Sequence, residues 1–290
     1  MSGKPKITLD DYTPASENAW CPGCGNFGIL RAVNQALVEL QLEPWQMLMV
    51  SGIGQAAKLP HYTRTNIFNG LHGRPLPAAI GAKTVNTELT VIAESGDGDA
   101  YGEGGNHFIQ AMNRNPDITY LVHNNQVYGL TKGQASPTTD LGFTTKLNPD
   151  GAWVALHPLA LAVAADCSFI ARGFAGDPDH LAGLISQAIR HPGFALVEIL
   201  QPCVSFNKKN TFQWYQERVY KLEAESGYDP TDRMAAFGKA LEWGETIPIG
   251  IIYRQPRETF DEYLGTAGKE PLVLAQTDKS GVAELFGEFS

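Results

Sequence analysis

Two short polar segments carry the residue types best suited to holding a metal ion and an anion. Gly96-Asp97-Gly98-Asp99 follows the apolar run 89–93, and Asn124-Asn125 follows the apolar run 118–122. We expect both runs to be buried parallel strands, whose carboxyl ends form the ligand-binding edge of an open α/β sheet. The Asp97 carboxylate and the Asn125 carboxamide would then be neighbours. Hard oxygen ligands of this kind favour Mg²⁺, which proteins bind through one or two carboxylates together with phosphate oxygens.

The backbone around these two side chains suits a diphosphate. The carbonyl oxygen of Val127 can supply a third Mg²⁺ ligand if the turn 126–129 bends back over the ion. Gly96 and Gly98 leave room for phosphate, and nearby backbone N–H groups would donate to it. A Gly-Asp-Gly tripeptide alone is more often a simple turn. The Asn-Asn pair at the next strand end is what favours a Mg²⁺-diphosphate site.

The elements that must position these groups follow from the apolar periodicity of the chain. Strands and helices alternate, which predicts an α/β fold with a doubly wound, mostly parallel sheet. We expect a domain over residues 1–205 and a less regular C-terminal extension over 206–290. The loop 128–151 is long enough to cover an active site. The predicted strands are 47–50, 89–94, 118–123, 168–171 and 194–200, and the predicted helices are 27–40, 76–85, 104–114 and 179–190.

Composition narrows the class of protein. The chain has 290 residues and a formal net charge of −9, which argues against a general nucleic-acid binder because such proteins are usually basic. No apolar run reaches the roughly 20 residues needed to cross a bilayer. The first residues lack the apolar stretch of a signal peptide. These features predict a cytoplasmic enzyme that binds neither nucleic acid nor membrane.

The cysteines form a second candidate site. Cys21 and Cys24 are a Cys-x-x-Cys pair in a glycine-punctuated loop, and Cys203 follows the predicted strand 194–200 at the same sheet edge. Thiolates select zinc or iron–sulfur clusters. Cys167 begins another predicted buried strand, and we expect it to be a core residue because free cysteine is often fully buried.

The order of the motifs resembles the β subunit of the 2-oxoacid:ferredoxin oxidoreductases over about residues 15–225. The Gly-Asp-Gly and Asn-Asn pair is similar to the thiamine diphosphate signature. The segment 210–222 resembles the 2-oxoglutarate branch of the family. The motifs that carry the resemblance are Trp20-Cys21-Pro22-Gly23-Cys24-Gly25, Ser51-Gly52-Ile53-Gly54, His72-Gly73-Arg74, Gly96-Asp97-Gly98-Asp99, Asn124-Asn125, Tyr128-Gly129-Leu130-Thr131 and Gln201-Pro202-Cys203.

The resemblance implies an enzyme that oxidatively decarboxylates a 2-oxoacid to acyl-CoA and CO₂, or runs the reverse carboxylation. Thiamine diphosphate, Mg²⁺ and a [4Fe-4S] cluster would be its cofactors, and coenzyme A and ferredoxin would accept the acyl group and the electrons. The chain offers no glutamate that we can place at the aminopyrimidine ring. The resemblance implies that a separate α subunit supplies it, in an αβ or (αβ)₂ assembly, so that this chain alone is inactive.

The resemblance also assigns roles to individual residues. Asp97, Asn125 and Val127 would bind Mg²⁺, and Cys21, Cys24 and Cys203 would bind the cluster. His72, Lys58 and Thr131 are the candidate catalytic residues, with Lys58 either holding a substrate carboxylate as a point charge or lying solvated at a loop edge. The cofactor pocket would be lined by Gly52, Gly54, His72, Gly73, Gly96, Asp97, Gly98, Asp99, Asn125, Val127, Gly129, Leu130 and Thr131.

One position departs from the family pattern. The family's cluster takes four cysteines, and the third of them in sequence order would stand directly after Ser51-Gly52-Ile53-Gly54, where this chain has Gln55. The cluster is then kept with three thiolates and water or another oxygen, reduced to a three-iron cluster or a zinc ion, or absent; we favour a retained cluster. A thiamine diphosphate-dependent decarboxylase or synthase that needs no cluster is the alternative enzyme. A zinc or iron–sulfur electron-transfer module is the alternative outside catalysis, and it leaves Asp97 and Asn125 unexplained.

Overall fold

The apolar runs of the sequence form the strands of an open sheet in a computed structural model of the chain. The structure describes residues 6–276 apart from 15 and 154, together with 281 and 286–287. The described residues form an eight-stranded sheet of order β2-β1-β3-β4-β8-β7-β10-β9, in which only the β7–β10 pairing is antiparallel. The strands are β1 (Met47–Ser51), β2 (Asn66–Asn69), β3 (Thr90–Gly96), β4 (Ile118–Asn124), β7 (Phe169–Phe174), β8 (Phe194–Leu200), β9 (Val219–Lys221) and β10 (Ile247–Arg254).

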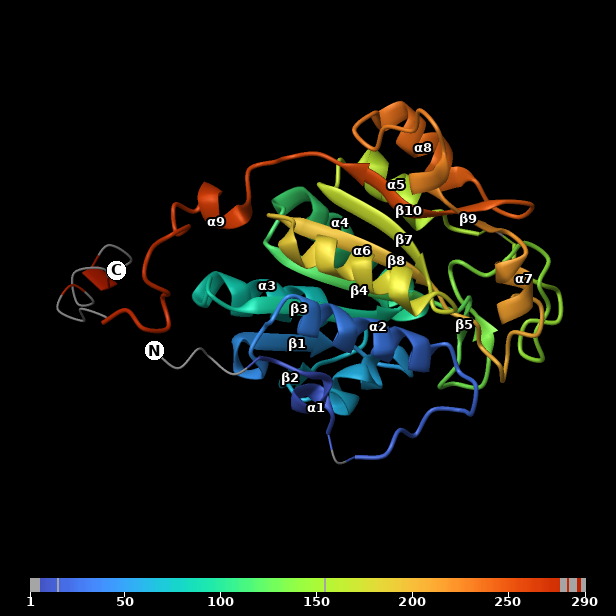
Figure 1. The fold of residues 1–290 in the computed structure, drawn as a ribbon, viewed down its shortest axis with the longest axis horizontal. Coiled ribbons are helices and arrows are strands. Elements are labelled where there is room, and N and C mark those ends of the chain that lie inside the picture. Colours follow the sequence, from blue (N-terminus) through green and yellow to red (C-terminus); the bar gives the residue numbers. More distant parts are fainter. Residues whose placement is uncertain (1–5, 15, 154, 277–280, 282–285, 288–290) are drawn as a thin grey trace.

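Helices cover both faces of this sheet (Figure 1). One face packs against α2 (Asn26–Glu39) and α6 (Pro178–Arg190), whose buried leucines, isoleucines and alanines form one core cluster. The other face packs against α3 (Pro75–Val85), α4 (Gly105–Arg114), α5 (Pro158–Ala164) and α8 (Arg233–Leu241). Every residue of β4 and β8 is buried, as expected for strands covered on both sides. The prediction of a doubly wound, mostly parallel α/β fold is confirmed.

The structure differs from the sequence-based expectation mainly at short elements and in the C-terminal region. β2 and α5 lie in segments for which we predicted no strand or helix. The C-terminal region contributes β9 and β10, so the sheet continues beyond residue 205. β10 was missed because its apolar run contains Pro248 and Gly250, residues that argue against a strand. The structure accommodates them with Gly250 at a φ of +126° and a register shift between Ile251 and Tyr253.

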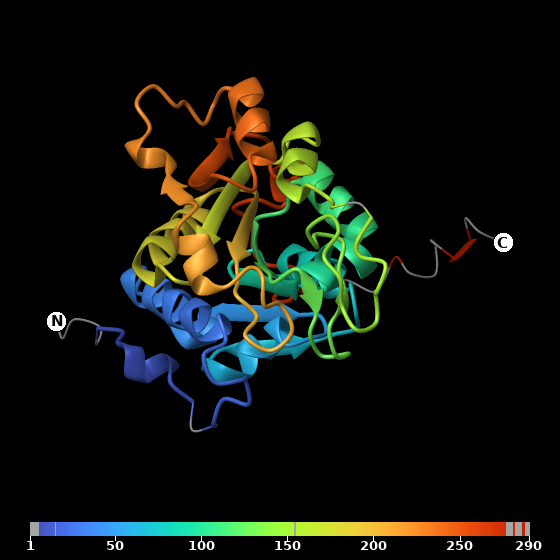
Figure 2. The same cartoon turned by 90° about the vertical axis from the view of Figure 1, so that its right-hand side faces the viewer.

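The loops that follow the parallel strands gather at one edge of the sheet. Figure 2 looks onto this edge, where the chain after β4 (green) and the chain after β8 (gold to orange) lie over the strand ends. The loop after β4 holds a short hairpin of β5 (Val127–Tyr128) and β6 (Gln134–Ala135). Three further short helices lie near this edge: η2 (Ala56–Tyr62) after β1, η3 (Gly98–Glu103) after β3 and α7 (Phe212–Gln216) after β8.

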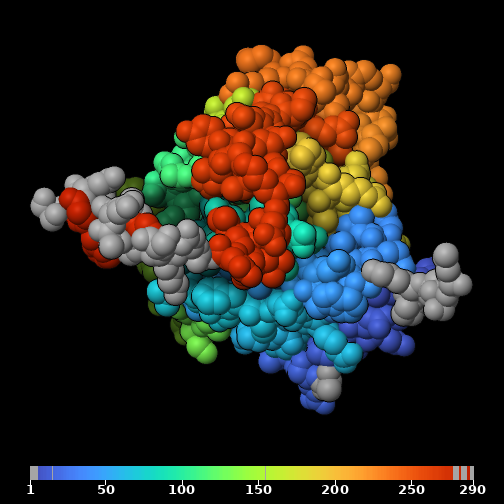
Figure 3. Space-filling view, turned by 90° about the vertical axis from the view of Figure 1, so that its left-hand side faces the viewer, coloured from blue at the N-terminus to red at the C-terminus, as the bar shows by residue number. Residues whose placement is uncertain are grey.

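The opposite edge is crossed by the C-terminal segment. Figure 3 shows the residues after β10 (red) lying across that face. Backbone hydrogen bonds fix this segment at Ser168, Asn115 and Val85, through the N–H groups of Gln255, Phe260 and Val273. It includes the short helix α9 (Phe260–Tyr263). Among the described residues, no helix is long and apolar enough to span a membrane.

Candidate active site

The two polar segments lie side by side, as their strand ends predict. β3 and β4 pair in parallel, with Gly96 opposite His123, so that Asp97 and Asn125 both leave the sheet at the same edge. Their side chains line one pocket together with Val127. The remaining lining residues come from the loops after β1, before α3, after β3 and after β4: Ile53, Gly54, Gln55, Ala56, His72, Gly96, Gly98, Asp99, Tyr128, Gly129, Leu130 and Thr131.

Asp97 is a buried carboxylate with no cationic side chain paired to it among the described residues. Its side chain is only 1 % exposed. Burial raises the pKa of Asp97 to about 6, although hydrogen bonds from Ser136 and Thr138 act in the opposite direction. Burying an ionised carboxylate is costly unless it is paired or coordinates a metal. A divalent cation bound against Asp97 would provide the missing charge compensation, so the residues present fit a Mg²⁺ ion.

Asn125 forms the turn that precedes Val127. Its Oδ1 atom accepts a hydrogen bond from the N–H of Val127 at 3.0 Å. Gln126, between them, has a φ of +62°, which turns the chain back towards the strand end. An amide oxygen has two lone pairs, so Asn125 can keep this hydrogen bond and still bind a metal. The geometry therefore agrees with the turn that we expected over the ion.

Residues 136–140, which sequence reasoning missed, contact both the loop after β3 and the loop after β4. The Thr138 hydroxyl donates to Oδ2 of Asp97 at 2.6 Å and lies 2.9 Å from the Oδ1 atom of Asn124. The Thr139 hydroxyl donates to the carbonyl of Gln126 at 2.6 Å. Outer contacts of this kind orient the groups that bind a metal. From the sequence, only the length of the surrounding loop indicated that it would lie near the active site.

Asp140 anchors the same segment to the rest of the molecule. Its Oδ1 atom accepts from Gln126 at 3.1 Å and from Trp243 at 2.9 Å. Its Oδ2 atom accepts from Asn210 at 3.2 Å and pairs with the Lys209 ammonium at 2.8 Å. Burial works to raise the pKa of Asp140, but its hydrogen bonds from Lys209, Asn210 and Trp243 lower it on balance. Asp140 thus joins the loop after β4 to the loop after β8.

Replacing Thr138 by valine tests the role of residues 136–140. Valine keeps the shape of threonine but removes the hydroxyl that contacts Asp97. We expect the Mg²⁺ affinity of the cofactor site to fall roughly 10–100-fold, as for other outer-shell changes. Isothermal titration with Mg²⁺ at saturating thiamine diphosphate measures it. Thr84→Val is the matched control, because the Thr84 hydroxyl donates to the Ile80 carbonyl within α3, away from the pocket; equal Mg²⁺ affinity in the two variants would contradict the prediction.

Asp99 binds neighbouring loops rather than standing free in the pocket. Its Oδ1 atom accepts from the backbone N–H of Ile53 at 3.1 Å and of Gly73 at 2.7 Å. It also lies 2.7 Å from Nδ1 of His72, and Ser95 donates to Oδ2 at 2.5 Å. This close approach places the His72 ring against Asp99 at the pocket wall.

Two of the glycines predicted to line the pocket are required by close packing of the loops. Neither Gly52 nor Gly73 is among the lining residues. A Cβ atom on Gly52 would lie 2.0 Å from Oδ2 of Asp99. Gly73 has a φ of +70°, and a Cβ atom there would lie 2.4 Å from the carbonyl carbon of Glu103. Both positions therefore require glycine for the close approach of the loops to Asp99 and η3.

The structure places two of the three candidate catalytic residues at the pocket and the third outside it. His72 and Thr131 line the pocket, whereas Lys58 lies on η2, partly exposed, and is not among the residues that line it. Thr131 is exposed, and its hydroxyl donates to Gln134 at 2.5 Å. Leu130 also lines the pocket and is 46 % exposed.

The three predicted ligand cysteines meet in an adjoining pocket. Cys21, Cys24 and Cys203 line it, and it shares Gln55, Asn125 and Gly129 with the cofactor pocket. The N–H of Gly25 donates to the carbonyl of Pro202 at 3.2 Å, which joins the two cysteine loops. Burial raises the pKa of Cys24 to about 11, and the nearby Cys203 and Cys21 add to this effect. Cys167 is fully buried in the core, as predicted.

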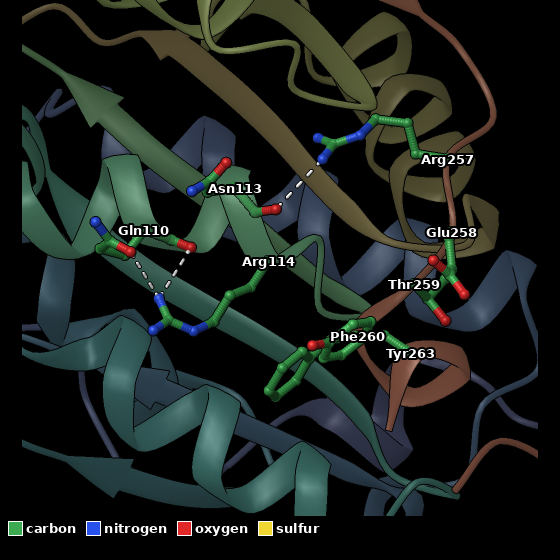
Figure 4. Close-up of a pocket in the computed structure, with 8 residues that line it drawn as sticks. All are labelled: Gln110, Asn113, Arg114, Arg257, Glu258, Thr259, Phe260 and Tyr263. Carbon is green, nitrogen blue, oxygen red and sulfur yellow. Dashed lines mark hydrogen bonds between the residues drawn. The ribbon is translucent and has the colours of Figure 1, made fainter. Parts of the chain in front are cut away.

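A larger hollow, of about 490 Å³, lies on the opposite edge of the sheet (Figure 4). Its arginines are already engaged by the chain itself. The Arg257 guanidinium donates to the carbonyls of Met112, Asn113 and Asp166, and Arg114 donates to Gln110. These contacts fasten the C-terminal segment to the end of α4. The two arginines of the hollow are therefore bound to other parts of the chain.

Comparison with known proteins agrees with the geometry of the site. Residues 48–199 match the model of "Thiamine pyrophosphate enzyme, C-terminal TPP binding domain", and residues 203–269 match the model of the C-terminal part of the pyruvate ferredoxin oxidoreductase beta chain. The β subunit of a 2-oxoacid:ferredoxin oxidoreductase from Saccharolobus solfataricus is 44 % identical over 289 residues, covering 93 % of this chain and 92 % of the relative. The 2-oxoglutarate synthase subunit KorB of Archaeoglobus fulgidus is 41 % identical over 201 residues, covering 68 % of this chain and 75 % of the relative.

A solved structure shares the whole fold. The 2-oxoglutarate:ferredoxin oxidoreductase from Magnetococcus marinus, determined with 2-oxoglutarate, coenzyme A and succinyl-CoA bound, superposes with a TM-score of 0.89 at 33 % identity. The match covers 96 % of each chain. Together with a pocket that brings Asp97 and Asn125 to the ends of adjacent strands, these similarities show that the chain belongs to the β subunits of the 2-oxoacid:ferredoxin oxidoreductases, thiamine diphosphate-dependent enzymes.

Proposed function

We propose that this β subunit binds thiamine diphosphate through Mg²⁺ and, with an α subunit, oxidises 2-oxoglutarate to succinyl-CoA and CO₂. The observation that carries the proposal is the buried, uncompensated Asp97 carboxylate beside Asn125. The choice of 2-oxoglutarate is supported by the relatives named 2-oxoglutarate synthase and by the ligands of the Magnetococcus marinus structure.

The residues of the pocket have distinct tasks in this proposal. Asp97, Asn125 and the carbonyl oxygen of Val127 would hold the Mg²⁺ ion, which would neutralise the charge of the diphosphate. Gly98 packs under the Tyr128 ring, since a Cβ atom there would lie 2.3 Å from Cε1 of that ring. Tyr128 thereby closes one side of the pocket. Hydrogen bonds from residues 136–140 fix the positions of the proposed metal ligands. When bound, thiamine diphosphate supplies the carbon nucleophile and the electron sink of the reaction.

His72 is the protein group best placed to act on a bound cofactor or substrate. Its Nδ1 atom is fixed by Asp99, and its side chain is 40 % exposed at the pocket. This contact orients the ring, which can then donate or accept a proton through Nε2. Thr131 at the pocket rim and Lys58 on η2 stay predictions as substrate-binding groups. Because Lys58 does not line the pocket in this structure, its side chain would have to move to contact a bound substrate.

The cysteine pocket fits an iron–sulfur cluster that receives electrons from the cofactor pocket. Three thiols from two loops face one hollow, and the two pockets share a wall that contains Gln55. Ferredoxin would take the electrons from this cluster. Among the described residues, no group of three His, Cys, Asp or Glu side chains is arranged to hold a single metal ion. Cluster ligands bind different irons and need not converge on one point.

The proposed activity is tested with the chain assembled with its α subunit and with the chain alone. We expect the assembled enzyme to reduce ferredoxin only when 2-oxoglutarate and coenzyme A are both present, and the single chain to be inactive. Pyruvate in place of 2-oxoglutarate should give at least about tenfold lower kcat/KM, the effect of roughly 1.4 kcal/mol in transition-state binding. Release of CO₂ without reduction of ferredoxin would instead indicate a non-oxidative decarboxylase.

A further inference from the structure

The wall between the two pockets contains a glutamine whose side chain is incompletely satisfied. Gln55 lies at the end of the loop that follows β1, and its backbone carbonyl accepts a hydrogen bond from Nε1 of Trp20 at 2.8 Å. This bond ties Gln55 to the residue next to Cys21. The Oε1 atom of Gln55 is buried and has no hydrogen-bond partner among the described residues. Leaving such an acceptor unpaired costs about 1–3 kcal/mol, which calls for a partner that the polypeptide does not supply.

The surroundings of Gln55 indicate what that partner is. Gln55 lines the same pocket as Cys21, Cys24 and Cys203. Three cysteines and Gln55, with its buried and unpaired carboxamide oxygen, therefore line one pocket, from the loops before α2, after β1 and after β8. Each of the four irons of a [4Fe-4S] cluster takes one ligand from outside the cluster, usually a cysteine thiolate. The chain offers three thiolates and one oxygen atom for these positions.

We propose that Oε1 of Gln55 is the fourth ligand of the iron–sulfur cluster held by Cys21, Cys24 and Cys203. The inference rests on the proposed function, because it presupposes that the cysteine pocket binds a cluster. Gln201 is the other glutamine of this pocket with an unpaired Oε1 atom among the described residues. Its Nε2 atom, however, donates to the sulfur of Cys24 at 3.4 Å. Gln201 is thus placed to support a thiolate rather than to bind iron.

A neutral ligand changes the charge of the cluster and its reduction potential. With Gln55 in place of a fourth thiolate, the cluster and its ligands carry one negative charge fewer. A less negative cluster accepts an electron more readily, so its reduction potential is higher than that of a four-thiolate cluster at the same place. Gln55 lines the cofactor pocket as well as the cysteine pocket, so a ligand at this position lies in the wall between the two. This arrangement favours withdrawal of electrons from the cofactor pocket over their return to it.

The experiment compares the anaerobically purified α–β enzyme with its Gln55→Cys and Gln55→Ala variants. We expect the wild-type cluster to show one iron with a distinct Mössbauer signature and hyperfine coupling to ¹³C-carboxamide-labelled glutamine. Gln55→Ala should lose that coupling and about one of its four irons on mild oxidation. Gln55→Cys should abolish the distinct iron and shift the midpoint potential to a lower value. Gln213→Ala is the matched control, because Gln213 is exposed and its side chain donates to the exposed Glu217.

The possible failures are distinguishable. If Gln55→Ala keeps the wild-type spectrum, iron content and potential, another group is the fourth ligand and the proposal is overturned, while the cluster itself stands. A three-iron cluster that is the same in the wild type and in Gln55→Ala would also overturn the proposal. If neither the wild type nor any variant contains iron, the iron–sulfur part of the proposed function fails as well. Thiamine diphosphate binding, measured in the same samples, separates that result from loss of the whole site.

Discussion

Asp97→Ala will abolish Mg²⁺-dependent binding of thiamine diphosphate by the assembled enzyme. The substitution removes the only carboxylate among the three expected metal ligands. Loss of a direct ligand should exceed the roughly 10–100-fold effect of outer-shell changes, so we expect more than about 100-fold weaker binding. Cofactor retained after gel filtration, measured over a series of Mg²⁺ concentrations, gives the result. Asp97→Asn keeps one oxygen ligand without the charge and should be intermediate.

A folding defect can be separated from the loss of the cofactor. Asp97 is buried without a cationic partner among the described residues, so its ionised carboxylate destabilises the cofactor-free chain. Asp97→Asn should therefore melt at the same temperature as the wild type, or higher, when both lack cofactor, and lower when both are given Mg²⁺ and thiamine diphosphate. The exposed Asp179, replaced by alanine, is the control for removal of a carboxylate. Unchanged Mg²⁺ dependence of cofactor binding in Asp97→Ala would show that the metal lies elsewhere.

The position of Asp97 beside Asn125 could be predicted from the sequence because it depends on strand ends. The apolar runs before Asp97 and before Asn124 are long enough to identify buried strands, and parallel pairing then brings their carboxyl ends together. The three cysteines could be placed by the same reasoning, because Cys203 follows β8 at the edge where Cys21 and Cys24 lie. These conclusions need only the order of strands and helices, which periodicity reveals.

The supporting contacts could not be predicted, because they join polar residues that are distant in the chain and have no periodicity. Thr138 and Asp97 are 41 residues apart, and Asp140 and Trp243 are 103 residues apart. No pattern within residues 136–140 indicates which side chains they meet. Asp99 was expected to bind the cofactor, and its packing against Gly73 became visible only in the structure. The unpaired Oε1 atom of Gln55 is likewise a property of the folded chain alone.

Glu198→Leu will destabilise the chain by about 3–5 kcal/mol, because it leaves the charge of Arg172 buried without a partner. Glu198 and Arg172 are directly opposite each other on β8 and β7, and they are 1 % and 3 % exposed. Nε of Arg172 donates to Oε2 of Glu198 at 3.2 Å, while its Nη1 atom has no partner among the described residues. Such a loss is a large fraction of the roughly 5–15 kcal/mol that stabilises a typical domain. Hydrogen exchange of the β7 and β8 amides in the assembled enzyme measures it.

Hydrogen bonds also connect this buried pair to Asp97, one of the proposed metal ligands. Nδ2 of Asn124 donates to Oε1 of Glu198 at 3.1 Å, and Oδ1 of Asn124 lies 2.9 Å from the Thr138 hydroxyl that contacts Asp97. Glu198→Leu should therefore weaken Mg²⁺ binding as well as stability. Asp179→Leu, which breaks an exposed pair with Arg31, should cost less than about 1 kcal/mol and leave Mg²⁺ binding unchanged.

The double variant Arg172→Met/Glu198→Leu decides whether the uncompensated charge is the cause. Removing both charges replaces the pair by apolar side chains of similar size, which in buried sites is often neutral or stabilising. The double variant should then be more stable than Glu198→Leu alone, with a coupling free energy of several kcal/mol between the two positions. Its Mg²⁺ binding should stay weakened, because Asn124 has still lost its acceptor. If the destabilisation of the double variant equals the sum for Arg172→Met and Glu198→Leu measured separately, lost packing is the cause. The two charges would then not stabilise each other as their contact indicates.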